Sequence, residues 1–227
     1  MGGILVAALV LYAASEALLP SLVSRAIERA VRDGLEGSPA VHVVVRSFPS
    51  FLMPMGHLDY ISLDISTFPV KGLTVRRLFL EAREVRLDLA GVFSGQGVDL
   101  KGLDRATVTV ILSQDDLNEY FQSRGGGLRF VRVNLSRGQA TLIAEVPFLG
   151  RVLRASVDGH FRVDGRTRIR FEVDRARVER FLIPRLIQEG ILGQLDLSVD
   201  LAGMPVPLTV HDVRVENGAI YVFGGKP

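Results

Sequence analysis

The stretch Arg-Thr-Arg-Ile-Arg-Phe-Glu-Val-Asp at residues 166–174 places an apolar side chain at every second position from Ile169 to Val173. Successive side chains of a β-strand point to opposite faces of the sheet. Ile169, Phe171 and Val173 therefore share one face, and charged side chains cover the other. The stretch predicts a strand in a sheet with one dry and one solvated face.

The same two-residue period recurs along most of the chain from Val41 onward. Gly138, Gly165 and Gly218 lie in short polar segments between such stretches, where hairpins need a residue that tolerates positive φ. We therefore predict an α+β fold that is mainly antiparallel β, whose large sheet twists into a strongly curved or barrel-like form. Further strands are expected at residues 41–45, 61–65, 73–80, 85–89, 106–112, 128–135, 139–146, 152–157, 195–201, 206–215 and 219–223.

The N-terminus begins with a helix-like apolar segment. Residues 4–14 are all apolar apart from the hydroxyl of Tyr12. This run is shorter than the roughly 20 residues of a transmembrane helix, and residues 1–3 lack the basic start of a cleavable signal. A truncated signal anchor, a helix in the membrane interface and a buried core helix all remain possible interpretations.

Beyond Pro20, apolar residues recur at three- and four-residue steps, which predicts an amphipathic helix continuing from the apolar segment. Gly34 and Gly37 end this pattern. We expect residues 1–19 to form an apolar anchor or truncated signal segment and residues 20–227 to form a single domain.

Two further short helices are expected. The first covers residues 113–122, with Ser113 as its N-cap, acidic residues in its first turn, and Leu117, Tyr120 and Phe121 on its apolar face. The second covers residues 178–192, with Pro184 either near its true start or at a kink. Both are expected to lie across the open mouth of the curved sheet.

Two loops are more apolar than turns require, namely residues 48–55 and 147–149. Exposed apolar loops usually contact a partner, a membrane or a ligand. For residues 48–55, contact with a membrane and folding back to plug one end of a barrel are both consistent with the sequence.

The composition argues against several classes of protein. The chain has no cysteine, and its four histidines stand apart without the spacing of a zinc site. Nucleotide-binding and hydrolase motifs are absent from the sequence. Basic side chains comprise 24 arginines and 3 lysines, but acidic residues are interspersed among them and the net charge is only +2. We therefore expect no enzyme, no cofactor, no metal and no nucleic-acid partner.

From residue 14 onward the chain resembles the LmeA-like phospholipid-binding proteins of bacterial envelopes. The likeness rests on the order and spacing of several short motifs. They are Glu16 and Pro20 in the N-terminal helix, Gly56–Leu63, Gly72–Leu78, Val85–Leu89, Leu117–Phe121, Ile183–Pro184, Met204–Leu208 and Val213–Gly218.

The resemblance implies a curved antiparallel sheet that wraps a long helix and leaves an apolar groove. It also implies an extracytoplasmic protein, membrane-anchored or membrane-associated, that binds phospholipid and supports envelope glycolipid or lipoglycan assembly. The short N-terminus, without basic residues, departs from this pattern and leaves the mode of anchoring open. An envelope scaffolding protein that recruits a membrane enzyme, without a lipid ligand, is the main alternative, and a lipid hydrolase is a third.

Candidate site residues follow from residue type. Arginine suits phosphate headgroups because its planar guanidinium donates two parallel hydrogen bonds. The headgroup candidates are Arg76, Arg77, Arg124, Arg129 and Arg132. The candidates for acyl-chain contact are Leu117, Tyr120, Phe121, Phe181, Leu182, Leu186 and Ile187 on the two helices, with Phe48, Phe51 and Leu52 at the mouth.

Overall fold

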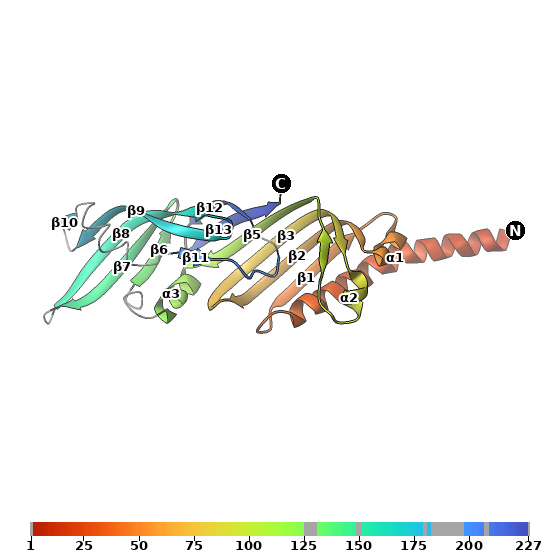
Figure 1. Ribbon diagram of the computed structural model, residues 1–227, viewed down its shortest axis with the longest axis horizontal. Coiled ribbons are helices and arrows are strands. Elements are labelled where there is room, and N and C mark those ends of the chain that lie inside the picture. Colours follow the sequence, from red (N-terminus) through yellow and green to blue (C-terminus); the bar gives the residue numbers. More distant parts are fainter. Residues whose placement is uncertain are drawn as a thin grey trace. The chain divides into compact units, whose positions relative to one another are not determined.

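The computed structural model describes residues 2–124, 131–148, 151–178, 181–182, 198–206 and 209–226. The chain divides into two compact units. Unit 1 comprises residues 1–68, 77–108 and 225–227, and unit 2 comprises residues 69–76 and 109–224. The predicted fold class is confirmed, because the protein is α+β with mostly antiparallel strands (Figure 1).

The first sheet has the strand order β1-β2-β3-β5-β13-β12, with β4 beside β3, and the second has the order β10-β9-β8-β7-β6, with β11 beside β9. The helices are α1 (Gly2–Asp33), the 3₁₀ helix η1 (Ser50–Met55), α2 (Leu89–Phe93) and α3 (Gln114–Ser123). The strands are β1 (Ala40–Arg46), β2 (His57–Val70), β3 (Leu73–Leu87), β4 (Leu100–Gly102), β5 (Arg105–Ser113), β6 (Val131–Ser136), β7 (Gln139–Phe148), β8 (Arg151–Asp164), β9 (Arg168–Val178), β10 (Phe181–Leu182), β11 (Ser198–Asp200), β12 (Val210–Glu216) and β13 (Ala219–Lys226).

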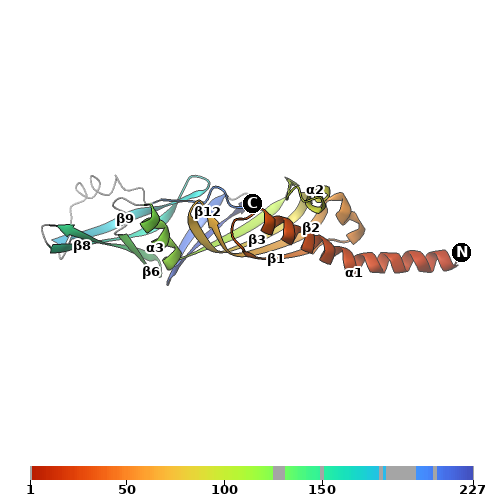
Figure 2. The ribbon, with the colours of Figure 1, turned by 90° about the horizontal axis from the view of Figure 1, so that it is seen from below.

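In unit 1, α1 is one continuous helix that runs through Pro20, as the sequence predicted. Its second half buries Val23, Ala26 and Ile27 and packs against β1. Its first half extends beyond the strands of unit 1 (Figure 2) and exposes apolar side chains such as Leu9 and Leu11. The helix therefore has a packed half and an apolar exposed half.

The edge strand β1 is held by polar side chains of α1. Glu28 accepts a hydrogen bond from the backbone N–H of Val43 at 3.0 Å, and Ser24 accepts one from the N–H of Val45 at 3.1 Å. Residues four apart on a helix thus bind residues two apart on a strand. These bonds satisfy N–H groups that an edge strand otherwise leaves unpaired.

The apolar loop at residues 48–55 contains η1, and the loop buries some of its side chains and exposes others. Met53 and Ser50 are fully buried, whereas Phe48, Phe51 and Met55 are exposed. Gly56 follows with φ of 86° and ends the 3₁₀ helix. The loop therefore contributes to the interior and also presents apolar side chains outward.

The predicted break at residues 81–84 is wrong, because β3 continues from Leu73 to Leu87. Arg83 and Glu84 are both exposed, and Glu84 has φ of 49°. This irregularity shifts the phase of the alternation, which explains why one strand resembles two in the sequence. The short helix α2, where Asp88 accepts a hydrogen bond from Gly91 N, was not predicted.

In unit 2, the predicted helix near residues 113–122 is confirmed as α3. The Ser113 side chain caps it by accepting a hydrogen bond from Asp116 N. Leu117, Tyr120 and Phe121 are buried on the face that the sequence predicted. The helix packs against β6, the edge strand of a five-strand antiparallel path that curves into a half-barrel.

α3 holds its edge strand in the same way as α1 holds β1. Asn118 accepts a hydrogen bond from Val133 N at 2.6 Å and donates one to Val133 O at 3.2 Å. Gln114 accepts one from Leu135 N at 2.8 Å. Again a four-residue spacing on the helix matches a two-residue spacing on the strand, so in each unit a helix binds the edge strand that follows it in the chain.

The predicted helix at residues 178–192 is wrong at its start. Val178 ends β9, and Phe181 and Leu182 form β10, which pairs antiparallel with Val178 and Arg177. The apolar spacing of this segment suits a helix, but its first residues pair with β9 as a β-strand. The remaining predicted helix, residues 183–192, lies outside the described residues.

We expect Asn118→Ala to lower the free energy of unfolding by about 1–3 kcal/mol, because it leaves the N–H and C=O of Val133 without these hydrogen bonds. The control is Glu119→Ala, which changes an exposed residue of the same helix and is expected to stay within about 0.5 kcal/mol of the parent. Denaturant unfolding followed by circular dichroism measures both. Equal stability of the two variants would contradict a structural role for Asn118.

Candidate functional site

The predicted acyl-contact residues that the structure describes fall in both units. Leu117, Tyr120 and Phe121 are at most 4% exposed in unit 2, where the rings of Tyr120 and Phe121 lie 5.5 Å apart. Phe181 and Leu182 lie on β10, also in unit 2. Phe48, Phe51 and Leu52 belong to unit 1, and Leu186 and Ile187 lie outside the described residues.

The sheet of unit 2 carries a continuous apolar face with small side chains at several positions. Leu142 pairs with Val157 and Ala144 pairs with Ala155 across β7 and β8. Leu142 and Val157 are buried, whereas Ala144 and Ala155 are only half-buried on the same face. An apolar face whose packing loosens along its length leaves surface that an apolar ligand can cover.

Two of the predicted headgroup arginines bind carboxylates of the protein. Arg76 donates two hydrogen bonds to Asp116, from Nε at 3.2 Å and from Nη2 at 2.9 Å, and the Asp116 carboxylate is buried. Arg77 makes a two-point contact with Asp64 on the exposed face of the sheet in unit 1. The hydrogen bonds from Arg77 hold the pKa of Asp64 below its ordinary value.

The other headgroup candidates differ in their surroundings. The guanidinium of Arg124 lies 4.8 Å from the ring centroid of Tyr120, a cation–π contact. Arg132 is exposed on β6, and its charge lowers the pKa of Glu145, although hydrogen bonds from Arg154 are the main cause. Arg129 lies outside the described residues.

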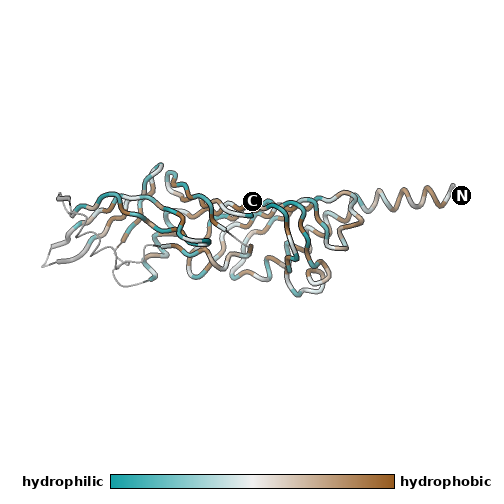
Figure 3. Tube along the Cα trace, turned by 45° about the horizontal axis from the view of Figure 1, so that its top comes forward, coloured by the Kyte–Doolittle hydropathy of each residue, from teal (hydrophilic) through white to brown (hydrophobic). Residues whose placement is uncertain are grey.

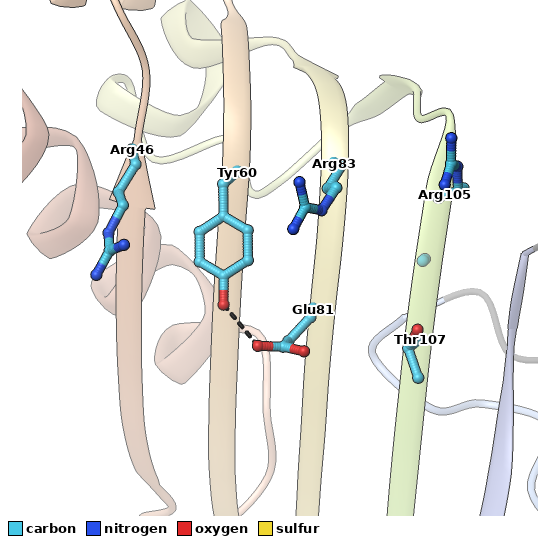
Figure 4. Close-up of a pocket in the computed structure, with 7 residues that line it drawn as sticks. Arg46, Tyr60, Glu81, Arg83, Arg105 and Thr107 are labelled. Carbon is cyan, nitrogen blue, oxygen red and sulfur yellow. Dashed lines mark hydrogen bonds between the residues drawn. The ribbon is translucent and has the colours of Figure 1, made fainter.

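The structure adds a charged site that the sequence did not reveal, a surface hollow of about 610 Å³ in unit 1 (Figure 4). The hydroxyl of Tyr60 donates a hydrogen bond to Glu81 at 2.7 Å, which raises the pKa of Tyr60. Three arginines and this one carboxylate line the hollow, so its lining carries net positive charge, although Arg105 also pairs with Asp104 at 3.7 Å. We call it the arginine hollow, and it is lined by Arg46, Tyr60, Glu81, Arg83, Arg105, Ala106 and Thr107.

Strand register explains why sequence reasoning missed this hollow. Arg46 pairs directly with Tyr60 across β1 and β2, and its guanidinium lies 5.9 Å from the Tyr60 ring centroid. Arg83 and Arg105 stand 22 residues apart in the sequence, on β3 and β5. Each arginine alone resembles an ordinary solvated side chain, and only the pairing of strands brings them together.

Within the described part of the chain, no group of three histidine, cysteine or acidic side chains is arranged to hold a metal ion. His160 lies beside Asp174 at 3.2 Å and Glu172 at 3.7 Å on the charged face of unit 2. In the part of the chain that the structure describes, one helix, at residues 3–33, is long and apolar enough to cross a membrane, a property that signal sequences and core helices of soluble proteins also have.

The described residues thus form a mainly antiparallel α+β protein with an apolar face on a curved sheet and an exposed apolar N-terminal helix, as in a signal sequence or a membrane anchor. Comparison with known families is more specific. A family model described as LmeA-like phospholipid-binding matches residues 14–224, so the chain belongs to the LmeA-like phospholipid-binding family. Neither a curated protein nor a solved structure matches the chain.

Proposed function

We propose that this protein is a non-enzymatic phospholipid-binding protein of the cell envelope, anchored to the membrane by α1 and acting outside the cytoplasm. Membership of the LmeA-like phospholipid-binding family over residues 14–224 is the observation that carries the proposal. A role in envelope glycolipid or lipoglycan assembly is part of the same proposal. The exposed apolar half of α1 supports the anchoring.

We place the acyl chains on the apolar face of the curved sheet in unit 2. Support comes from Ala144 and Ala155, which are cross-strand neighbours on this face of the sheet and are only half-buried. Burial of each CH₂ group contributes about 0.8 kcal/mol, so a modest length of acyl chain gives substantial affinity. Phe181, Leu182, Leu186 and Ile187 remain proposed contacts of the acyl chains.

The test is to purify the full chain in a detergent that contains no phosphate, wash it extensively, and quantify extracted phospholipid by mass spectrometry. We expect about one retained phospholipid per chain and loss of this lipid in the double variant Leu182→Asp/Leu186→Asp. The control is Phe79→Asp, which changes an exposed side chain of β3 in unit 1 and retains α1. Lipid bound only loosely around α1 would be equal in all three proteins, and this result would contradict a specific site.

A further inference from the structure

Four exposed aromatic or methionine side chains belong to two neighbouring elements of unit 1. Phe48 is 75% exposed, Phe51 51%, Met55 74% and Phe93 60%. The first three belong to the loop around η1 and the fourth ends α2, and these two elements pack against each other and against α1. We call these four residues the apolar collar. Exposed apolar groups of this kind mark a surface that contacts a partner or a membrane.

The collar is attached to α1 at the point where the exposed half of this helix ends. Glu16 accepts hydrogen bonds from the backbone N–H of Ser50 at 2.8 Å and from its hydroxyl at 2.7 Å. On the N-terminal side of this contact, α1 exposes apolar side chains from Ile4 to Leu11, apart from Ala8, which is not described. Figure 3 shows that this part of α1 contains apolar and neutral residues. The collar thus extends the exposed apolar surface of α1 onto the loop around η1 and onto α2.

The arginine hollow lies at the same end of the strands as the collar. Arg46 ends β1 two residues before Phe48, and Arg105 begins β5. A second hollow, of about 600 Å³, is lined by Met55 of the collar and by Asp104, the neighbour of Arg105, and its other charged residues are Asp59, Glu84 and Arg86. The collar and the arginine hollow therefore lie near each other in unit 1, with the carboxylates of this second hollow beside them.

We propose that the collar and the arginine hollow together dock unit 1 on the surface of an anionic bilayer. Apolar side chains next to guanidinium groups match the acyl and phosphate layers of a membrane interface. The inference rests on the proposed anchoring by α1, because a helix embedded in the bilayer would hold the attached collar next to the lipid surface. The docked partner is the lipid surface itself, and arginines of the hollow contact headgroup phosphates.

The absence of cysteine in the chain makes single spin labels unambiguous. Met55→Cys and Phe93→Cys report on the collar, and Leu9→Cys reports on the exposed half of α1. The aqueous control is Glu36→Cys, an exposed residue in the loop before β1, at the opposite end of that strand from Arg46. The full chain is reconstituted into vesicles that contain phosphatidylglycerol, and collisions of each label with oxygen and with a water-soluble nickel chelate are measured.

We expect the labels at positions 55 and 93 to be several-fold less accessible to nickel than the label at position 36, and less immersed than the label at position 9. The double variant Arg83→Glu/Arg105→Glu is expected to restore nickel access at position 55 in phosphatidylglycerol vesicles. Nickel access equal to that of position 36, with position 9 immersed, would overturn the docking and leave the anchor intact. A label at position 9 that is itself exposed to nickel would instead overturn the proposed anchoring.

Discussion

Gly56→Ala is expected to lower the free energy of unfolding by about 3 kcal/mol or more, through strain combined with a steric clash. Gly56 has φ of 86°, a conformation that disfavours residues with a side chain. A Cβ atom at this position would also collide with the carbonyl oxygen of Leu87, a backbone atom that cannot move independently. Gly56 donates to Met53 O at 2.7 Å and accepts from Leu87 N at 2.9 Å, so the clash displaces η1 from the end of β3.

The matched control for this variant is Gly72→Ala. Gly72 also has positive φ, of 81°, but a Cβ there would meet no atom within 4 Å. Its loss of stability is expected to be about 1 kcal/mol, from backbone strain alone. Unfolding in denaturant, followed by far-ultraviolet circular dichroism, separates the two effects. If both variants lose the same stability, the contact between Gly56 and Leu87 does not constrain the collar loop.

Arg76→Ala is expected to lower the free energy of unfolding by about 2 kcal/mol, because it leaves the buried carboxylate of Asp116 without its cation. The remaining partners of that carboxylate are the hydroxyl of Ser113 and the N-terminus of α3. The estimate stays moderate because the Arg76 side chain is itself about half exposed, at 51%.

The neighbouring residue provides a control for Arg76. Arg77 pairs with Asp64 on the exposed face of the sheet, so Arg77→Ala is expected to change stability by less than about 1 kcal/mol. The same variants test the headgroup prediction made from the sequence. If Arg76→Ala left stability unchanged but reduced phospholipid retention, Arg76 would contact lipid and not hold α3 in place.

Much of the fold followed from local patterns. The alternation around Ile169 predicted a strand, and β9 contains it. Ser113 predicted the start of α3, because an N-cap acts within one turn and needs no tertiary context. The phase slip at Glu84 and the five residues of α2 could not be predicted, since a bulge and a single helical turn leave almost no periodic signal.

The candidate site was less predictable because its parts depend on strand register. The sequence does not indicate the role of Asn118, whose amide binds the backbone of Val133 on an edge strand. Arg46 and Tyr60 meet only because β1 and β2 pair at that register. The collar residues Phe48 and Phe51 were singled out from the sequence, since apolar residues in a proline-containing loop need no register to be recognised.

The polar contacts of α1 also determine what motion unit 1 would retain if α1 anchored the protein in a membrane, as proposed. Glu16 binds the η1 loop, and Ser24 and Glu28 bind β1, so three contacts spread over residues 16–28 attach the helix to the rest of unit 1. A helix attached at a single point could swivel, but one attached at three cannot rotate about its own axis without breaking all of these bonds. These contacts also hold unit 1 at a fixed angle to the helix, so a bilayer that held α1 would always meet the same end of unit 1.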